Sequence, residues 1–144
     1  MIKFGSVLLG ALVVGTLACA EDLIEPGQWK VTTMMTMNGA AAPPQAKMRC
    51  ITPDQAADVA KTFGPVAGSV NSTCETPQSE MNGRALKWRL QCRGTLDLDV
   101  DGQFNFDGPR HYSATVISKG RMAGQLISDV KSELEGERVG DCTQ

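Results

Sequence analysis

Residues 82–102 read NGRALKWRLQCRGTLDLDVDG, and this stretch decides the fold class. The Asn82-Gly83 dipeptide favours the two-residue turn of a β-hairpin. After it, apolar and polar residues alternate, which is the pattern of strands with one buried face. We therefore expect antiparallel strands that share one apolar face. Its members are Leu86, Trp88, Leu90, Cys92, Leu96, Leu98 and Val100.

The same alternation extends towards both ends of the chain. Residues 28–38 and 45–51 read as strands on the N-terminal side, and residues 104–116 continue the pattern on the C-terminal side. Residues 121–134 fit a strand better than a helix, although the spacing of Leu126, Val130 and Leu134 keeps the helix as an alternative. Further turns are expected at Asp101-Gly102, Asp107-Gly108 and Lys119-Gly120.

One helix interrupts the strands. Thr52 is a favourable N-cap, Pro53 suits the first helical position, and Asp54 complements the positive end of the helix dipole. The helix should end at about Phe63, before Gly64. The predicted fold is mainly β: an antiparallel meander forming a curved sheet or partial barrel, with one short helix from about Pro53 to Phe63 and two disulfides.

The N-terminus has the features of a secretory signal peptide. Lys3 precedes an apolar run over residues 7–17, and small residues follow immediately before two acidic ones. We expect residues 1–20 to be removed and residues 21–144 to form a single β-rich domain, periplasmic or secreted. The alternative is a lipoprotein anchored through Cys19.

Charge narrows the classes of partner. Without the signal peptide the chain has thirteen basic and sixteen acidic residues and no basic block. A nucleic-acid partner is therefore not expected. The sequence shows no transmembrane segment after the signal peptide and does not predict the oligomeric state.

Beyond the signal peptide the cysteines are Cys50, Cys74, Cys92 and Cys142. An even number in a short exported chain predicts two disulfides. A two-residue turn at residues 82–83 would place Cys74 opposite Gln91, and so on the other face from Cys92. We therefore expect the pairs Cys50–Cys74 and Cys92–Cys142, unless a one-residue bulge in the hairpin reverses this parity.

Two metal sites were weighed and are not favoured. Residues 97–102 match the start of a calcium-binding loop, but the twelfth position is Gly108 where a bidentate glutamate is needed. The aspartates are better explained as the outer face of a hairpin. The thioethers of Met34, Met35, Met37 and Met48 suit Cu(I), yet methionine is also a common core filler and no histidine or free thiol accompanies them.

Catalysis is the other alternative. His111 is the only histidine, and a periplasmic hydrolase would need it as a general base. The chain contains no G-x-S-x-G motif, and its cysteines are expected to be oxidised. We therefore expect no catalytic residue and no cofactor, with a structural role for His111.

Several short motifs together resemble a known family. They are Glu25-Pro26-Gly27-Gln28-Trp29, the Met-rich first strand, Cys50-Ile51-Thr52-Pro53 before a helix, Trp88 with Cys92, and Gly136 with Gly140-Asp141-Cys142. In this order, with four cysteines, they resemble the bacterial "domain of unknown function 3617" family of exported proteins. The chain departs from it at residues 136–139, which read GERV where the family usually has a basic pair. The resemblance implies a periplasmic location and a β fold, and it implies no activity.

The apolar face gives the leading functional hypothesis. If the sheet curls incompletely, this face lines a groove that binds an apolar small molecule or an envelope protein, and the protein is a non-catalytic envelope domain. The alternative is that the same residues simply fill the interior. The candidate ligand-binding residues are Trp29, Met35, Met37, Trp88 and Leu90, with Phe104 and Phe106 as further members of the stripe.

Overall fold

The structure is a computed structural model that describes residues 22–66 and 72–143. The predicted signal peptide (residues 1–20) and the candidate lipidation site Cys19 lie outside these ranges. No helix among the described residues is long and apolar enough to cross a membrane.

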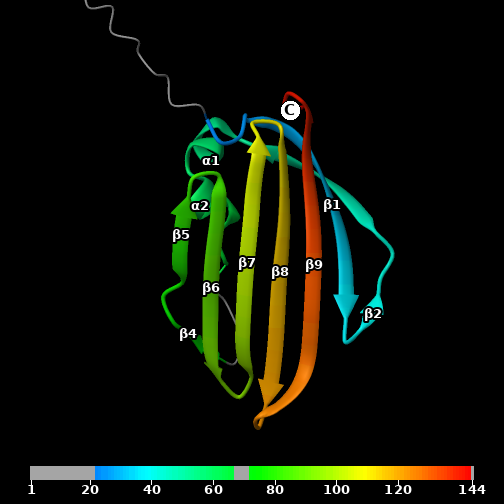
Figure 1. Ribbon diagram of the computed structural model, residues 1–144, viewed down its shortest axis with the longest axis vertical. Coiled ribbons are helices and arrows are strands. Elements are labelled where there is room, and N and C mark those ends of the chain that lie inside the picture. Colours follow the sequence, from blue (N-terminus) through cyan, green and yellow to red (C-terminus); the bar gives the residue numbers. More distant parts are fainter. Residues whose placement is uncertain (1–21, 67–71, 144) are drawn as a thin grey trace, which may run out of the picture.

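The predicted β fold is confirmed: the strands form one antiparallel sheet (Figure 1). Across the sheet the order is β3 and β2, β1, β9, β8, β7, β6, and then β4 and β5. Within the described ranges no pairing joins the two outer edges, so the sheet is an open arc. The strands are β1 (Gly27–Met37), β2 (Ala40–Ala41), β3 (Gln45–Ile51), β4 (Ser72–Cys74), β5 (Gln78–Asn82), β6 (Ala85–Gly94), β7 (Asp97–Gly108), β8 (His111–Met122) and β9 (Gln125–Gly140).

The predicted helix is present but broken into α1 (Pro53–Ala57) and α2 (Val59–Phe63). Thr52 caps α1 with a full capping box, as its sequence indicates. Asp58 then leaves the helical conformation, and its side chain accepts a hydrogen bond from the Lys61 backbone N–H. Asp58 therefore ends one helix and starts the next, because an aspartate competes well as an N-cap.

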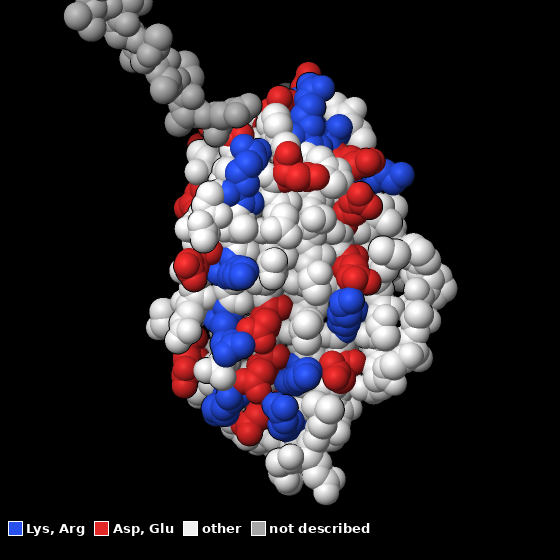
Figure 2. Space-filling model, viewed as in Figure 1, with Lys and Arg blue, Asp and Glu red and all other residues white. Residues whose placement is uncertain are grey.

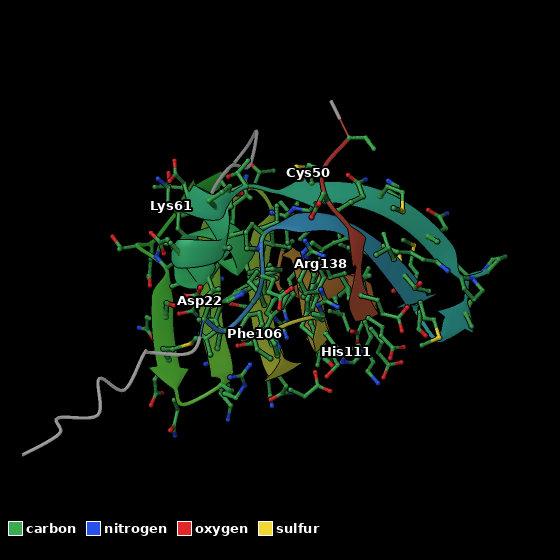
Figure 3. The ribbon with its side chains drawn as sticks, turned by 90° about the horizontal axis from the view of Figure 1, so that it is seen from above. Asp22, Cys50, Lys61, Phe106, His111 and Arg138 are labelled. Carbon is green, nitrogen blue, oxygen red and sulfur yellow. A yellow bond between two sulfur atoms is a disulfide. The ribbon has the colours of Figure 1, made fainter. Side chains whose placement is uncertain are left out.

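The two helices lie between the edges of the arc, as the view from above shows (Figure 3). The side chains of α1 and α2 that turn inward are Ala56, Val59 and Phe63, all buried. Phe63 packs against Phe104, Phe106 and Tyr112 at ring-centroid distances of 5.0 to 5.4 Å. The helices thus cover one half of the concave face and complete the core there.

Two predicted turns are wrong, because Gly102 and Gly120 lie inside β7 and β8. A Cβ at Gly102 would lie 2.2 Å from a ring carbon of Trp88, so the glycine makes room for the indole. The third predicted turn, at Asp107-Gly108, falls two positions later, at residues 109–110, because Gly108 pairs with His111. Residues 125–134 are strand, as favoured, and not helix.

The predicted disulfide pairing is also wrong: Cys50 is bonded to Cys142, and Cys74 to Cys92. Asn82 pairs with Ala85, so the hairpin turn is one residue later than expected. If this register continued along the hairpin, Cys74 would lie opposite Arg93. The pairing then shifts by one residue between β5 and β4, where Pro77 cannot donate to the ladder, and Cys74 faces Cys92.

Candidate functional site

The predicted apolar stripe forms the concave face of the sheet, but the structure divides it into two halves. Along β1, three residues of the stripe become steadily more accessible: Trp29 is 0%, Met35 37% and Met37 51% exposed. All three point to the concave side, because side chains two apart in a strand share a face. The covered half therefore comprises the start of β1 and the β6 side of the sheet, including Leu90, which is level with Met37. The uncovered half lies at the end of β1.

The covered half contains both tryptophans. The indole N–H of Trp29 donates to the backbone oxygen of Glu25 at 3.1 Å, and that of Trp88 donates to the Phe63 oxygen at 2.9 Å. Each buried indole thus has its one polar group satisfied inside the protein. Leu90 is also buried, at 4% exposure. The structure therefore places these three candidate residues in the interior.

The uncovered half has an apolar floor supplied by four strands. Met37 of β1 pairs with Val130 of β9, which pairs in turn with Ser118 of β8; Met35 is likewise aligned with Ser132 and Val116. Side chains that pair across neighbouring strands project on the same face. Those of the two methionines, Val116, Val130 and Leu134 therefore form one continuous surface, with Val100 of β7 beyond them. Val100, Val116 and Leu134 are partly buried and pack against the core, so this surface continues the core.

The hollows of the molecule lie mainly on the other, outer face of the sheet. One of about 440 Å³ spans β5 to β8, and one of about 490 Å³ spans β7, β8, β9 and β1. Among the five predicted ligand residues only Trp88 borders either hollow. Most of the residues that line them are polar or charged, and Gln103 and Thr115 border both.

Sequence reasoning missed this polar band, although its signal was present. Gln103 and Asn105 alternate with the core phenylalanines of β7, and Ser113 and Thr115 alternate with Tyr112 and Ala114 of β8. The register places Gln103 opposite Thr115 and Asn105 opposite Ser113. Figure 2 shows the outer face of β6 to β9, where an uncharged band separates groups of charged side chains. The alternation shows that these residues share the outer face, but it does not show which residues of β7 and β8 lie opposite each other.

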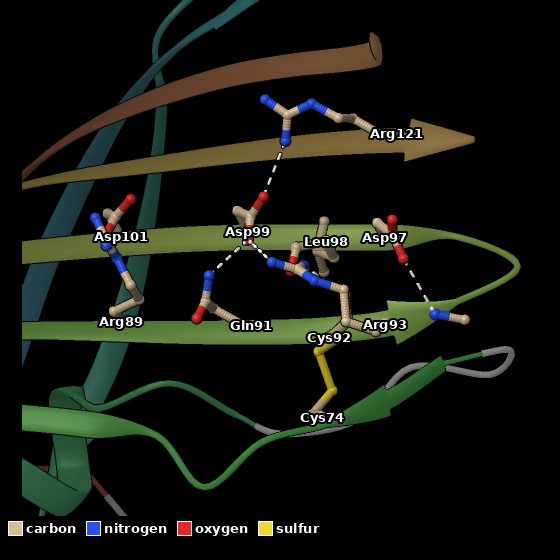
Figure 4. A network of polar contacts seen from close by, with 11 residues as sticks. Cys74, Arg89, Gln91, Cys92, Arg93, Asp97, Leu98, Asp99, Asp101 and Arg121 are labelled. Atoms are coloured by element: carbon tan, nitrogen blue, oxygen red, sulfur yellow. Dashed lines mark hydrogen bonds and ion pairs between the residues drawn. A yellow bond between two sulfur atoms is a disulfide. The ribbon is translucent and has the colours of Figure 1, made fainter. Parts of the chain in front are cut away.

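The aspartates considered for calcium are held by arginines instead (Figure 4). Asp99 accepts hydrogen bonds from Arg93 at 2.8 Å and from Arg121 at 2.9 Å. The Arg93 hydrogen bond in particular holds the pKa of the Asp99 carboxyl below its usual range. Asp101 is paired with Arg89 at 2.6 Å. These carboxylates lie along one face of β7, so they link β6, β7 and β8 and do not form a calcium loop.

His111 lies on the outer face, on the opposite side of the sheet from Phe106 (Figure 3). Its Nδ1 is 2.6 Å from Asp107 Oδ1, and its Nε2 is 3.0 Å from Glu135 Oε1. The hydrogen bond to Asp107, and secondarily that to Glu135, raises the pKa of His111. Because both ring nitrogens are engaged by carboxylates, the geometry does not present a free base to a nucleophile. It suits a histidine that links β8 to β9.

The methionines do not form a single sulfur cluster. Met34 and Met35 are consecutive in β1 and so point to opposite faces, and Met48 is on the outer side with Met34. Of the four methionines considered for copper, Met35 and Met37 share the concave face. Two thioethers are fewer than the three or four soft ligands that a closed Cu(I) site needs.

The motif residues near the two ends of the chain meet in one structural corner. Arg138 donates to the Pro26 oxygen at 2.8 Å and to Asp141 at 2.7 Å, and Glu25 accepts from Arg110 at 2.9 Å. A Cβ at Gly27 would lie 2.4 Å from the Gly140 oxygen. These motifs therefore fasten the first strand to the last.

No curated protein and no solved structure was found to match the chain. The family model described as "Protein of unknown function (DUF3617)" matches residues 24–142, from the start of the core through the last disulfide cysteine. The chain therefore belongs to the DUF3617 family, as its motifs predict.

Proposed function

We propose that the protein is a non-catalytic domain of the periplasm or cell envelope that binds an apolar or amphipathic ligand on the uncovered half of its concave face. One observation carries the proposal. Along β1, residues of a single apolar stripe go from complete burial at Trp29 to half exposure at Met37. A stripe that served only as core would be buried along its whole length.

The chemistry of the uncovered half favours an apolar chain. Methionine side chains are flexible and polarisable, and they adapt to ligands of varied shape. Val116, Val130 and Leu134 add a branched aliphatic floor, and Ser118 and Ser132 supply hydroxyls beside it. Such a mixture is typical of sites that hold a hydrocarbon chain and orient a polar head group.

The proposed location rests on the disulfides and on the predicted signal peptide. Disulfides persist in oxidising compartments, so the two bridges support an exported protein. Retention of a lipidated Cys19 would tether the same domain to a membrane surface. Intact mass of the exported protein distinguishes the two, because a lipid adds to the mass of the processed chain.

Adjacent methionines on β1 provide a matched test. We expect a dansyl-labelled fatty acid to bind the exported protein, and lipid to co-purify with it in native mass spectrometry. Replacing Met35 and Met37 together by glutamine should weaken binding roughly tenfold, since each substitution removes about half of a buried side chain's transfer free energy. Met34→Gln, equally exposed but on the outer face, should bind as the wild type does.

Two results would contradict the proposal. One is a wild-type protein that neither binds the probe nor carries a ligand. The other is that Met34→Gln on the outer face weakens binding of the fatty acid as much as the double variant does, which would show that binding does not depend on the concave face. A hydrolytic turnover abolished by His111→Ala would overturn its non-catalytic part.

A further inference from the structure

The turn between β8 and β9 extends beyond the rest of the sheet. Pairing of β7 with β8 begins at Arg121, and pairing of β1 with β9 ends at Val130. Among the strands that the structure describes, the residues between these positions pair only with one another, within the β8–β9 hairpin. In Figure 1 this turn is the lowest point of the molecule. We call residues 122–128 the hairpin tip.

The hairpin tip exposes apolar side chains on both of its faces. Met122 is 47%, Leu126 52% and Ile127 50% exposed. Leu126 pairs with Arg121 and so lies on the outer face, whereas Met122 is the next residue of β8 and points to the other side. A register shift at this pair inserts Ile127 beside Leu126. The bulge thus enlarges the apolar surface at the end of the hairpin.

A second uncharged segment lies next to the tip. No charged residue occurs between Lys30 and Lys47, so the lower part of β1, the following turn and β2 are all neutral. This segment is joined to the base of the tip, because the Asn38 backbone N–H donates to the Asp129 oxygen at 2.8 Å. The return bond, from the Asp129 N–H to Asn38 Oδ1, is 2.9 Å. In Figure 2 the lowest point and the lower right of the molecule carry no charged side chains.

The shape of the tip indicates what covers it. A flat protein surface would bury one face of a projecting hairpin and leave the other in water, whereas a fluid apolar medium surrounds both. Met122 pairs with Gln125 around the positive-φ residues Ala123 and Gly124, so the backbone groups that face into the hairpin are bonded. The backbone groups that face outward need water, so the tip suits the hydrated interfacial region of a bilayer and not its hydrocarbon core.

We propose that the hairpin tip inserts into the interfacial region of a phospholipid bilayer, with the neutral β1–β2 turn against the same surface. This contact is independent of the proposed ligand, although it would set the uncovered half of the concave face close to the lipid. Met37 is paired with Val130, directly behind the tip.

The test uses the exported protein, shown by intact mass to carry no lipid, and vesicles of phosphatidylethanolamine and phosphatidylglycerol. Wild-type protein should float with the vesicles in a density gradient, and high salt should not release it, because the contact is apolar. The double variant Leu126→Ser/Ile127→Ser should lower the partition coefficient roughly tenfold or more. Val139→Ser is the matched control: Val139 is 53% exposed on the same strand at its other end, and its variant should bind vesicles as the wild type does.

Binding of the dansyl fatty acid should survive in the tip variant, which separates this proposal from the ligand site. The proposal is overturned if the wild-type protein does not float, if the tip variant floats equally well, or if salt abolishes binding in both. It is also overturned if the tip instead mediates self-association, seen as a dimer in light scattering that the serine variants abolish without any vesicle binding.

Discussion

Removal of the Cys50–Cys142 bridge should cost the folded protein about 4.6 kcal/mol, according to loop-closure entropy for the 92-residue separation of the two cysteines. The same relation gives about 3.2 kcal/mol for Cys74–Cys92, whose separation is 18 residues. For a domain of this size these losses correspond to falls in Tm of roughly 18 °C and 13 °C. The larger effect belongs to the bridge that joins β3 to the C-terminal end of the chain.

Pairs of alanine substitutions test the connectivity directly. Because Cys50 and Cys142 share one bridge, the double variant Cys50→Ala/Cys142→Ala should be about as stable as either single variant. Cys50→Ala/Cys74→Ala breaks both bridges and should lose about 8 kcal/mol, comparable to the whole stability of a typical domain. Urea unfolding followed by tryptophan fluorescence measures these differences, and intact mass after alkylation counts the bridges that remain.

The opposite order of stabilities would refute the pairing. If Cys50→Ala/Cys74→Ala kept one bridge and a cooperative transition while Cys50→Ala/Cys142→Ala unfolded, the bridges would be the ones first expected from the hairpin parity. Under either pairing, only one of these two double variants keeps a bridge. Finding one bridge in both variants after alkylation would therefore contradict both pairings.

Two further perturbations test the packing and the outer face. Gly102→Ala should destabilise the protein by about 1–3 kcal/mol, because the added Cβ meets the buried Trp88 ring at 2.2 Å. Gly108→Ala is the control, because no atom lies within 4 Å of the Cβ that it adds. Equal urea midpoints for the two variants would contradict this expectation. His111→Gln should lower stability most below about pH 6.5, by less than about 1 kcal/mol because the pair is partly solvated. Asp107 raises the pKa of His111 in the folded protein above its value in the unfolded chain. The stability that this pair contributes is therefore fully present below the unfolded-state pKa and is lost as the pH rises through the folded-state pKa. Thermal melts of both proteins at about pH 5.5 and about pH 9 check this, and a difference that does not change with pH would count against it.

Alternation predicted the faces of the strands well. Trp29, Met35 and Met37 share the concave face, as their spacing indicates, and so do Trp88 and Leu90. The helix start at Thr52 was also readable, because capping is a local interaction between residues three apart. Such local patterns are reliable where neighbouring residues in the chain decide the outcome.

Glycine was the main source of error in the predicted turns. Gly102 lies within a strand because the ring of Trp88 occupies the space that a Cβ would fill, at 2.2 Å. A glycine that admits a ring from a neighbouring strand has the same local sequence as a glycine in a turn. Only the partner strand distinguishes the two cases.

Alternation along the chain predicts strands that share one apolar face, because a period of two is a property of each strand alone. The tertiary structure decided the strand register, hence which cysteines meet, since a single shift near Pro77 moves Cys74 opposite Cys92. It also decided where the apolar stripe is covered. Met37 is half-exposed at the end of β1, whereas Leu90, level with it across the sheet, is buried, so exposure along the stripe depends on long-range packing.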